Sequence, residues 1–116
     1  MIFIDNESPI PVFEQIRVQI ETQIIGGKLG PQQRLPTVRQ LASDLGIAPG
    51  TVSRAYAELE SVGLIETHGR RGSRVADNIE DRSEVLDAAL DYSLVARKSG
   101  LTLAQAILAL RASWDA

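Results

Sequence analysis

The sequence predicts a mainly α-helical protein with one small β-hairpin. Apolar residues recur at helical spacing in five stretches. One pair of short strand-like runs, residues 64–67 and 73–76, flanks a turn that contains glycine. Only three residues separate the second stretch from the third. We therefore expect three helices, a hairpin and two further helices, in that order.

Length and composition limit the class of protein. The chain has 116 residues, of which 44% are apolar, so it is expected to be globular, with one small domain and an appendage. It has no cysteine, which excludes disulfides and thiolate metal sites and fits a reducing compartment. No apolar run is long enough for a membrane span or a signal peptide, so we expect a cytoplasmic protein.

Charge is distributed unevenly along the chain. The net charge is −3, but residues 34–74 contain six arginines and four acids, a local charge of +2. Residues 78–116 contain four basic and six acidic residues, a local charge of −2. The middle of the chain is thus suited to phosphates, and its end is not.

The first helix is expected from about Val12 to Ile25. Its apolar face consists of Phe13, Ile16, Ile20 and Ile24, and Gly26-Gly27 ends it. Residues 28–36, with two prolines and a glycine, are expected to form a loop.

Two short helices follow. Thr37 and Gln40 form a capping box at the start of the first, and Gly46 ends it. The second begins at Pro49, after a turn of three residues. Such spacing is typical of a helix-turn-helix, although helical hairpins unrelated to DNA share it.

The second of these helices begins without a capping side chain. Ala48 lies where Ser or Asp is usual, and Pro49 and Gly50 add little bulk. We expect this helix N-terminus to press against a large, negatively charged partner.

The hairpin has a basic tip, His68-Gly69-Arg70-Arg71-Gly72. Helix, helix-turn-helix and hairpin is the order of a winged-helix domain, which we assign to residues 1–77.

Residues 78–116 are expected to form a two-helix dimerisation tail. One helix is expected over residues 82–98, and Thr102 and Gln105 cap a second. Both helices carry apolar stripes, which they can cover only in part by packing on each other. The alternative is that these helices pack on their own winged helix. A dimer interior would have room for a small apolar or uncharged effector, although no residue identifies one. The stripes are Leu86, Leu90 and Leu94, and Leu103, Ile107, Leu110 and Trp114.

The candidate contact residues are mainly arginines. Arg39 lies on the polar face of the first short helix, where a helix-turn-helix crosses the DNA backbone. Arg54 is placed to reach a base edge or a phosphate; the alternative is an ion pair with Glu58. Arg70 and Arg71 suit a groove or a phosphate strand, against the alternative of a solvated turn.

Catalysis has no residues to support it. His68 is the sole histidine, so neither a His-based metal site nor a Ser-His-Asp triad has a partner set. There is no phosphate-loop or dinucleotide motif. We expect no enzyme activity, no metal and no cofactor.

The runs PVFEQI, LPTVRQLASDLGI, TVSRAYAELESVGLIET and GRRGSRV resemble the DNA-binding part of GntR-family transcription regulators, from about Ser8 to Val75. The resemblance implies a winged helix that binds palindromic operators as a homodimer. It places DNA contacts at Arg39, Thr51, Ser53 and at His68-Gly69. Together with the residues argued above, the expected DNA-contact set is Thr37, Arg39, Gly50, Thr51, Ser53, Arg54, His68, Gly69, Arg70 and Arg71.

Two positions depart from the family pattern. Ala48-Pro49 replaces a Ser-Arg pair, which removes an arginine often used to read bases, and Gln32 replaces a loop glycine. The two-helix tail resembles the short, YtrA-like subgroup. The leading hypothesis is a sequence-specific transcription regulator, with repression favoured over activation. A small-molecule effector, where one binds, would relieve the repression. The alternative is a winged-helix protein adaptor without DNA binding, which would not need the arginine-bearing wing.

Overall fold

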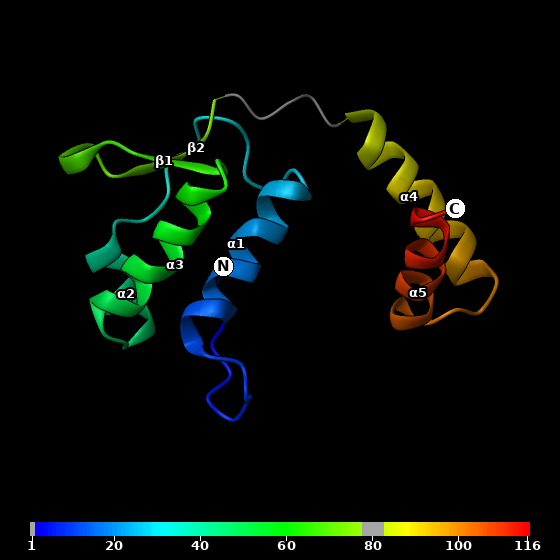
Figure 1. The fold of residues 1–116 in the computed structure, drawn as a ribbon, viewed down its shortest axis with the longest axis horizontal. Coiled ribbons are helices and arrows are strands. Elements are labelled where there is room, and N and C mark those ends of the chain that lie inside the picture. The colour runs from blue at the N-terminus through cyan, green and yellow to red at the C-terminus, as the bar shows by residue number, and fades with distance from the viewer. Residues whose placement is uncertain (1, 78–82) are drawn as a thin grey trace. The chain divides into compact units, whose positions relative to one another are not determined.

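A computed structural model of the chain describes residues 2–77 and 83–116. The chain divides into two compact units, Met1–Glu80 and Asp81–Ala116. The first unit contains three helices and a β-hairpin, and the second contains two helices, as Figure 1 shows. The predicted fold class, mainly α with a small β-hairpin, is confirmed. Residues 78–82, at the start of the predicted tail, lie outside the described residues.

Helix α1 (Val12–Ile25) has the predicted bounds. Pro11 precedes it as the N-cap residue, and Gly26 follows its last turn. Its apolar face buries Ile16, Ile20 and Ile24, each at most 3% exposed, against the rest of the winged-helix core. The spacing of these three side chains is the helical period that the sequence shows.

Helices α2 (Val38–Leu45) and α3 (Pro49–Ser61) form the predicted helix-turn-helix. The Thr37 hydroxyl accepts a hydrogen bond from the Gln40 backbone N–H at 3.1 Å, and the Gln40 side chain accepts one from Thr37 N–H at 3.0 Å. Gly46 ends α2 with φ of +66°, a left-handed conformation that glycine adopts without steric cost. The turn between the two helices therefore depends on Gly46.

Helix α3 is held in the core by one face and by a long-range hydrogen bond. Its buried residues are Val52, Ala55, Tyr56 and Leu59. Tyr56 is only 4% exposed, and its hydroxyl donates a hydrogen bond to the Pro36 carbonyl at 2.7 Å. Burial raises the pKa of Tyr56 to about 12. This bond ties α3 to the segment that leads into α2.

The wing is the antiparallel hairpin of β1 (Ile65–Thr67) and β2 (Ser73–Val75), with Glu66 opposite Arg74. Each strand is one residue shorter than predicted, although Ala76 N–H still donates to Leu64 at 3.0 Å. A short 3₁₀ turn, η1 (Gly69–Arg71), forms the tip.

The segment predicted as a loop is partly extended. Leu35 N–H donates to Ser73 at 2.9 Å, and Val75 N–H donates to Gln33 at 2.9 Å. Arg34 and Arg74 form an isolated antiparallel bridge between these bonds. Gln32 has φ of +63°, so the residue that stands in the place of a family glycine keeps the left-handed backbone.

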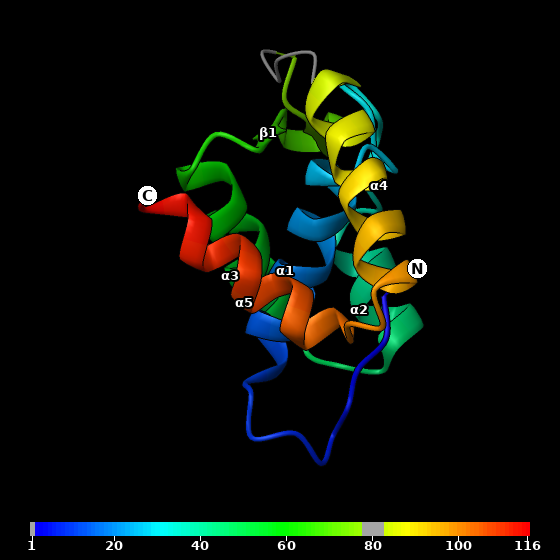
Figure 2. The ribbon, with the colours of Figure 1, turned by 90° about the vertical axis from the view of Figure 1, so that its right-hand side faces the viewer.

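The second unit consists of α4 (Ser83–Lys98) and α5 (Leu103–Trp114), which run in opposite directions (Figures 1 and 2). The Thr102–Gln105 capping box is present. Small side chains make the contact between the helices: Ala96 and Ala106 are buried, and the Tyr92 hydroxyl donates to the Ala106 carbonyl at 2.6 Å. No described helix is long and apolar enough to cross a membrane.

Candidate nucleic-acid interface

The N-terminus of α3 is open to solvent. Ala48, Pro49 and Gly50 are all exposed, and no side chain caps the helix. A Cβ atom added at Gly50 would meet no heavy atom within 4 Å, so the protein itself does not require glycine there. The bare start predicted from the sequence is thus present: Thr51 N–H donates to the Ala48 carbonyl at 3.1 Å, and no side chain caps the Gly50 N–H.

Four polar side chains of the helix-turn-helix are candidate contacts. Arg39 is exposed on α2, and its side chain makes no ion pair or hydrogen bond within residues 2–77 and 83–116. Ser53 is exposed and Thr51 is partly buried on the first turns of α3. The Thr37 oxygen is occupied as an acceptor in the capping box, which leaves its O–H as a donor.

The wing tip combines two left-handed glycines with basic side chains. Gly69 has φ of +59° and Gly72 has φ of +81°, and His68 N–H donates to Gly72 at 2.9 Å, which closes the turn. His68 Nε2 lies 3.3 Å from a Glu66 carboxylate oxygen. Arg71 is exposed at the tip. Arg70 lies between Gly69 and Arg71 in the same turn, and its side chain lies outside the described part of the structure.

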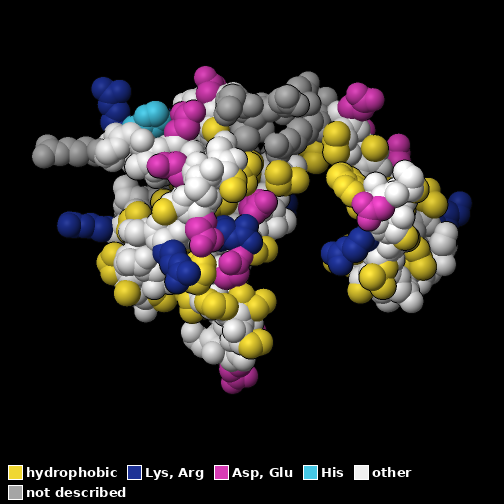
Figure 3. Space-filling model, viewed as in Figure 1, with side chains coloured by type: hydrophobic (Ala, Val, Ile, Leu, Met, Phe, Trp, Pro, Cys, Tyr) yellow, Lys and Arg dark blue, Asp and Glu magenta, His cyan; other side chains and the backbone are white. Residues whose placement is uncertain are grey.

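The turn at the wing tip lies close to the start of α2. A Cβ atom at Gly72 would lie 3.9 Å from the Thr37 methyl group. The wing and the start of α2 therefore lie next to each other, and Figure 3 shows dark-blue basic side chains on the side of the first unit where these two elements lie. This places the expected contacts Thr37, Arg39 and Arg71 on neighbouring elements.

Arg54 is exposed on α3, as predicted, but makes a contact that the sequence did not predict. Its guanidinium carbon lies 3.7 Å from the centroid of the Phe13 ring on α1. The predicted alternative, an ion pair with Glu58, is replaced by a contact between Glu58 and Arg17 at 3.7 Å. Arg17 also pairs with Glu14 and Glu21, and the hydrogen bond that its Nε donates to the Glu14 carboxylate raises the pKa of Arg17. Arg54 thus anchors α3 to α1 in addition to any contact with DNA.

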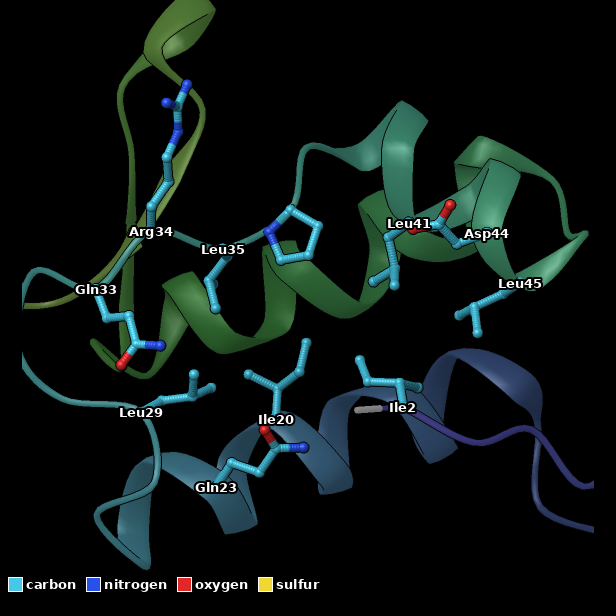
Figure 4. Close-up of a pocket in the computed structure, with 11 residues that line it drawn as sticks. Ile2, Ile20, Gln23, Leu29, Gln33, Arg34, Leu35, Leu41, Asp44 and Leu45 are labelled. Atoms are coloured by element: carbon cyan, nitrogen blue, oxygen red, sulfur yellow. The ribbon is translucent and has the colours of Figure 1, made fainter.

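An apolar groove of about 540 Å³ lies between α1, the segment before α2, and α2 itself, as Figure 4 shows. Ile20, Leu29, Leu35 and Leu41 form much of its wall. Its volume lies in the range of small-molecule sites. Among the described residues no group of three or more His, Cys, Asp or Glu side chains could hold a metal ion.

Residues 13–75 match the model of the bacterial regulatory proteins of the gntR family. The chain belongs to the gntR family. The match spans α1, the helix-turn-helix and the wing, which are the elements described above. The predicted membership of this family is confirmed.

Two relatives of this GntR-family protein carry names that state a role. The HTH-type transcriptional regulator Rv1152 of Mycobacterium tuberculosis is 42% identical over 104 residues, which cover 90% of this chain and 86% of that protein. The HTH-type transcriptional repressor YtrA of Bacillus subtilis is 44% identical over 78 residues, which cover 67% of this chain and 60% of that protein. The similarity to YtrA agrees with the predicted subgroup.

A solved structure with a related fold is the DNA-binding domain of AraR in complex with its operator ORX1. It is 30% identical, with a TM-score of 0.57, and the match covers 65% of this GntR-family chain and 93% of that domain. The related DNA-binding domain of AraR has therefore been solved while bound to an operator.

Sequence reasoning missed two features of the GntR-family domain in this chain. The first is the stacking of Arg54 on Phe13, and the second is the bridge between Arg34 and Arg74. Both join residues far apart in the sequence, and no local pattern marks either. An arginine and an aromatic ring are compatible partners, but only the fold brings Arg54 and Phe13 together.

Proposed function

We propose that this helix-turn-helix transcriptional regulator binds a palindromic operator in the cytoplasm as a homodimer and acts as a repressor. The observation that carries the proposal is the uncapped, exposed start of α3, which lies on the same unit as an unpaired Arg39 and a basic wing tip. Positive charge and free backbone donors are the groups that bind phosphate. The operator complex of AraR supports this use of the fold.

Each candidate residue has a role in this proposal. Arg39 and the Thr37 hydroxyl bind backbone phosphates beside α2. Ser53 and Thr51 reach base edges or phosphates from the first turns of α3, where Gly50 allows close approach. At the wing, His68, Gly69, Arg70 and Arg71 follow the adjacent groove. Arg54 acts mainly through its stack on Phe13, which fixes the angle of α3.

Repression follows from occupancy of the operator. A protein that covers a promoter excludes polymerase without further parts, and the repressor YtrA of Bacillus subtilis is among the relatives. The relatives are named as transcriptional regulators, which favours this function over the adaptor and over catalysis.

Dimerisation is assigned to the α4–α5 unit, residues 83–116 within the proposed tail of 78–116. The two helices meet through alanines, so their large apolar side chains remain open: Leu90 is 58% exposed and Trp114 is 80% exposed. Figure 3 shows hydrophobic side chains on the visible surface of this unit. A second copy that packs on these stripes would bury them in a four-helix arrangement. The other exposed members of the two stripes are Leu94, Leu103, Ile107 and Leu110, whereas Leu86 is half-buried.

The dimer is tested by sedimentation of the full chain carrying Leu90→Asp with Ile107→Asp. We expect this variant to sediment as a monomer, because two buried carboxylates would oppose the interface. A matched control is Glu84→Asp with Arg111→Lys, which keeps the charges of the same helices. This assignment would be contradicted if the Leu90→Asp/Ile107→Asp variant sedimented as a dimer, as the wild type is expected to do.

A small-molecule effector is the remaining part of the proposal, and we place it in the groove of Figure 4 instead of the dimer interior expected from the sequence, because this groove has the volume of a small-molecule site. An occupant would contact Ile20 of α1 and Leu41 of α2 together, so it would alter the position of the first helix of the helix-turn-helix. Compounds that raise the melting temperature of the wild type but not of Leu41→Phe, and that weaken operator binding, would support this placement. Stabilisation equal in both proteins would exclude it.

The DNA-binding function is tested by selection of duplexes from a random library with the full-length protein. We expect a palindromic sequence to be enriched and to bind at least about 10³ times more tightly than a mixed-sequence duplex. Failure to enrich any sequence would favour the adaptor function instead.

A further inference from the structure

The segment before α2 pairs with β2 through an isolated bridge beside the two-stranded wing. Residues 33–35 are bonded to β2 by the two hydrogen bonds that flank the Arg34–Arg74 bridge, Leu35 N–H to Ser73 and Val75 N–H to Gln33, both 2.9 Å. These bonds leave Arg34 and Arg74 as a non-hydrogen-bonded pair, the arrangement in which side chains of opposite strands lie closest. The pair lies on the face of the sheet opposite to the buried Val75.

Two like charges directly opposite each other destabilise a sheet. A carboxylate between them would offset this cost, and Glu66 is the cross-strand neighbour of Arg74 on β1. The Glu66 carboxylate, however, contacts His68 Nε2 at 3.3 Å. Arg74 Nη1 donates to the Gln32 carbonyl at 3.2 Å, a neutral acceptor. Within the described residues, Arg34 forms no ion pair or side-chain hydrogen bond.

The pair lies on the path toward the wing tip. Figure 4 shows the Arg34 side chain extending along the hairpin, with its guanidinium toward the tip. Arg34 is exposed and Arg74 is half-buried. A duplex backbone that follows the wing from Arg71 would therefore meet Arg34 next.

We propose that Arg34, supported by Arg74, binds a backbone phosphate of the operator beside the wing tip. This rests on the proposed DNA-binding function and adds the middle of the wing to its contact surface. The phosphate supplies the negative charge that the free protein lacks between the two guanidinium groups, and its oxygens accept bidentate N–H donation. Because the contact is to phosphate, it contributes to affinity on every sequence alike.

The test compares Arg34→Gln with Lys28→Gln, which removes one positive charge from an exposed position elsewhere in the same unit. Binding to the selected operator and to a mixed-sequence duplex is measured from 50 to 300 mM KCl. We expect Arg34→Gln to lower the slope of log affinity against log salt by about 0.9 on both duplexes, as loss of one phosphate contact requires. Lys28→Gln should leave the slope unchanged, and Arg34→Lys should restore most of it.

Thermal unfolding of the free proteins gives the second readout. Removal of one of two opposed charges should leave the melting temperature of Arg34→Gln equal to or above that of the wild type, so weaker binding cannot come from loss of the fold. The proposal would be overturned if Arg34→Gln bound the operator with the same slope of log affinity against log salt as the wild type. The proposal would also be overturned if inorganic phosphate, at matched ionic strength, stabilised the wild type but not Arg34→Gln while the salt slope of DNA binding stayed the same in both proteins. That result would assign the pair of arginines to free phosphate. A wild-type protein that binds no duplex would instead refute the proposed function.

Discussion

The guanidinium carbon of Arg54 lies 3.7 Å from the centroid of the Phe13 ring, so the recognition helix α3 is stacked on α1 by a cation–π contact. An exposed contact of this kind contributes about 0.5–1 kcal/mol. The same α1–α3 boundary carries the Arg17–Glu58 ion pair. These two contacts lie at the edge of the apolar core that packs α3 on α1.

The first prediction follows from this stack. Arg54→Gln should lower the free energy of unfolding by about 0.5–1 kcal/mol in the wild type, and by less in a Phe13→Leu background, because the ring is then absent. Urea denaturation of the four proteins of this cycle measures the coupling. We expect the salt slope of operator binding to stay unchanged in Arg54→Gln. Equal losses in both backgrounds would contradict the stack, and a slope that falls by about 1 would make Arg54 a phosphate contact.

Gly50 gives the second prediction. Because a Cβ atom there meets nothing within 4 Å, Gly50→Ala should fold without strain and gain up to about 1 kcal/mol of stability from helix propensity. Operator affinity should nevertheless fall, because the methyl group would occupy space that the duplex approaches. Chemical denaturation and fluorescence anisotropy measure the two effects. Ser61→Ala at the other end of α3 is the control, and unchanged affinity in Gly50→Ala would remove the helix start from the interface.

The bounds of the helices could be predicted because their signals are local. Pro11, Gly26, the Thr37–Gln40 box and Gly46 mark helix ends through the conformations and hydrogen bonds of adjacent residues. The face that α4 turns toward α5 could not be predicted. The leucine stripe is the stronger apolar pattern, yet the buried side chains of the two helices, among the described residues, are Ala96 and Ala106.

The candidate site divides along the same line. Arg39, Gly50 and the wing glycines could be located from motif and spacing. The partners of Arg54, Arg34 and Tyr56 could not, because each of these contacts is made across the fold by a residue distant in the sequence. Such pairs depend on packing geometry, which no periodic pattern encodes.

The third prediction concerns pH. The pKa of Tyr56 is about 12 in the folded protein against an ordinary value of 10.0, so folding favours the protonated hydroxyl. The stability from this group should be complete below pH 10 and should be lost as the pH rises from 10 to 12, by about 2–3 kcal/mol. Tyr56→Phe should lack this term, although it loses about 1 kcal/mol at neutral pH with the bond to Pro36. Parallel pH profiles for the two proteins would contradict the assignment.

Arg39 gives the fourth prediction. Because its side chain has no partner in the described residues, Arg39→Ala should leave the melting temperature unchanged. As a phosphate contact, it should weaken binding on all duplexes and lower the salt slope by about 1. A loss of about 1–3 kcal/mol confined to the selected operator would show a base contact instead. Unchanged binding at every salt concentration would place Arg39 outside the interface.

The central claim is that two copies of the winged helix bind one palindrome, and half-site spacing tests it most directly. Two recognition helices related by a two-fold axis reach half-sites about one helical turn apart, on one side of the duplex. Insertion of five base pairs between the half-sites of the selected operator moves one half-site to the opposite side. Fluorescence anisotropy with the full-length protein should show that affinity falls to that of a mixed-sequence duplex. Insertion of ten base pairs returns the half-site to the original side of the duplex and should restore part of the affinity. Equal affinity for the original and the five-base-pair-shifted operator would contradict a dimer that binds both half-sites together.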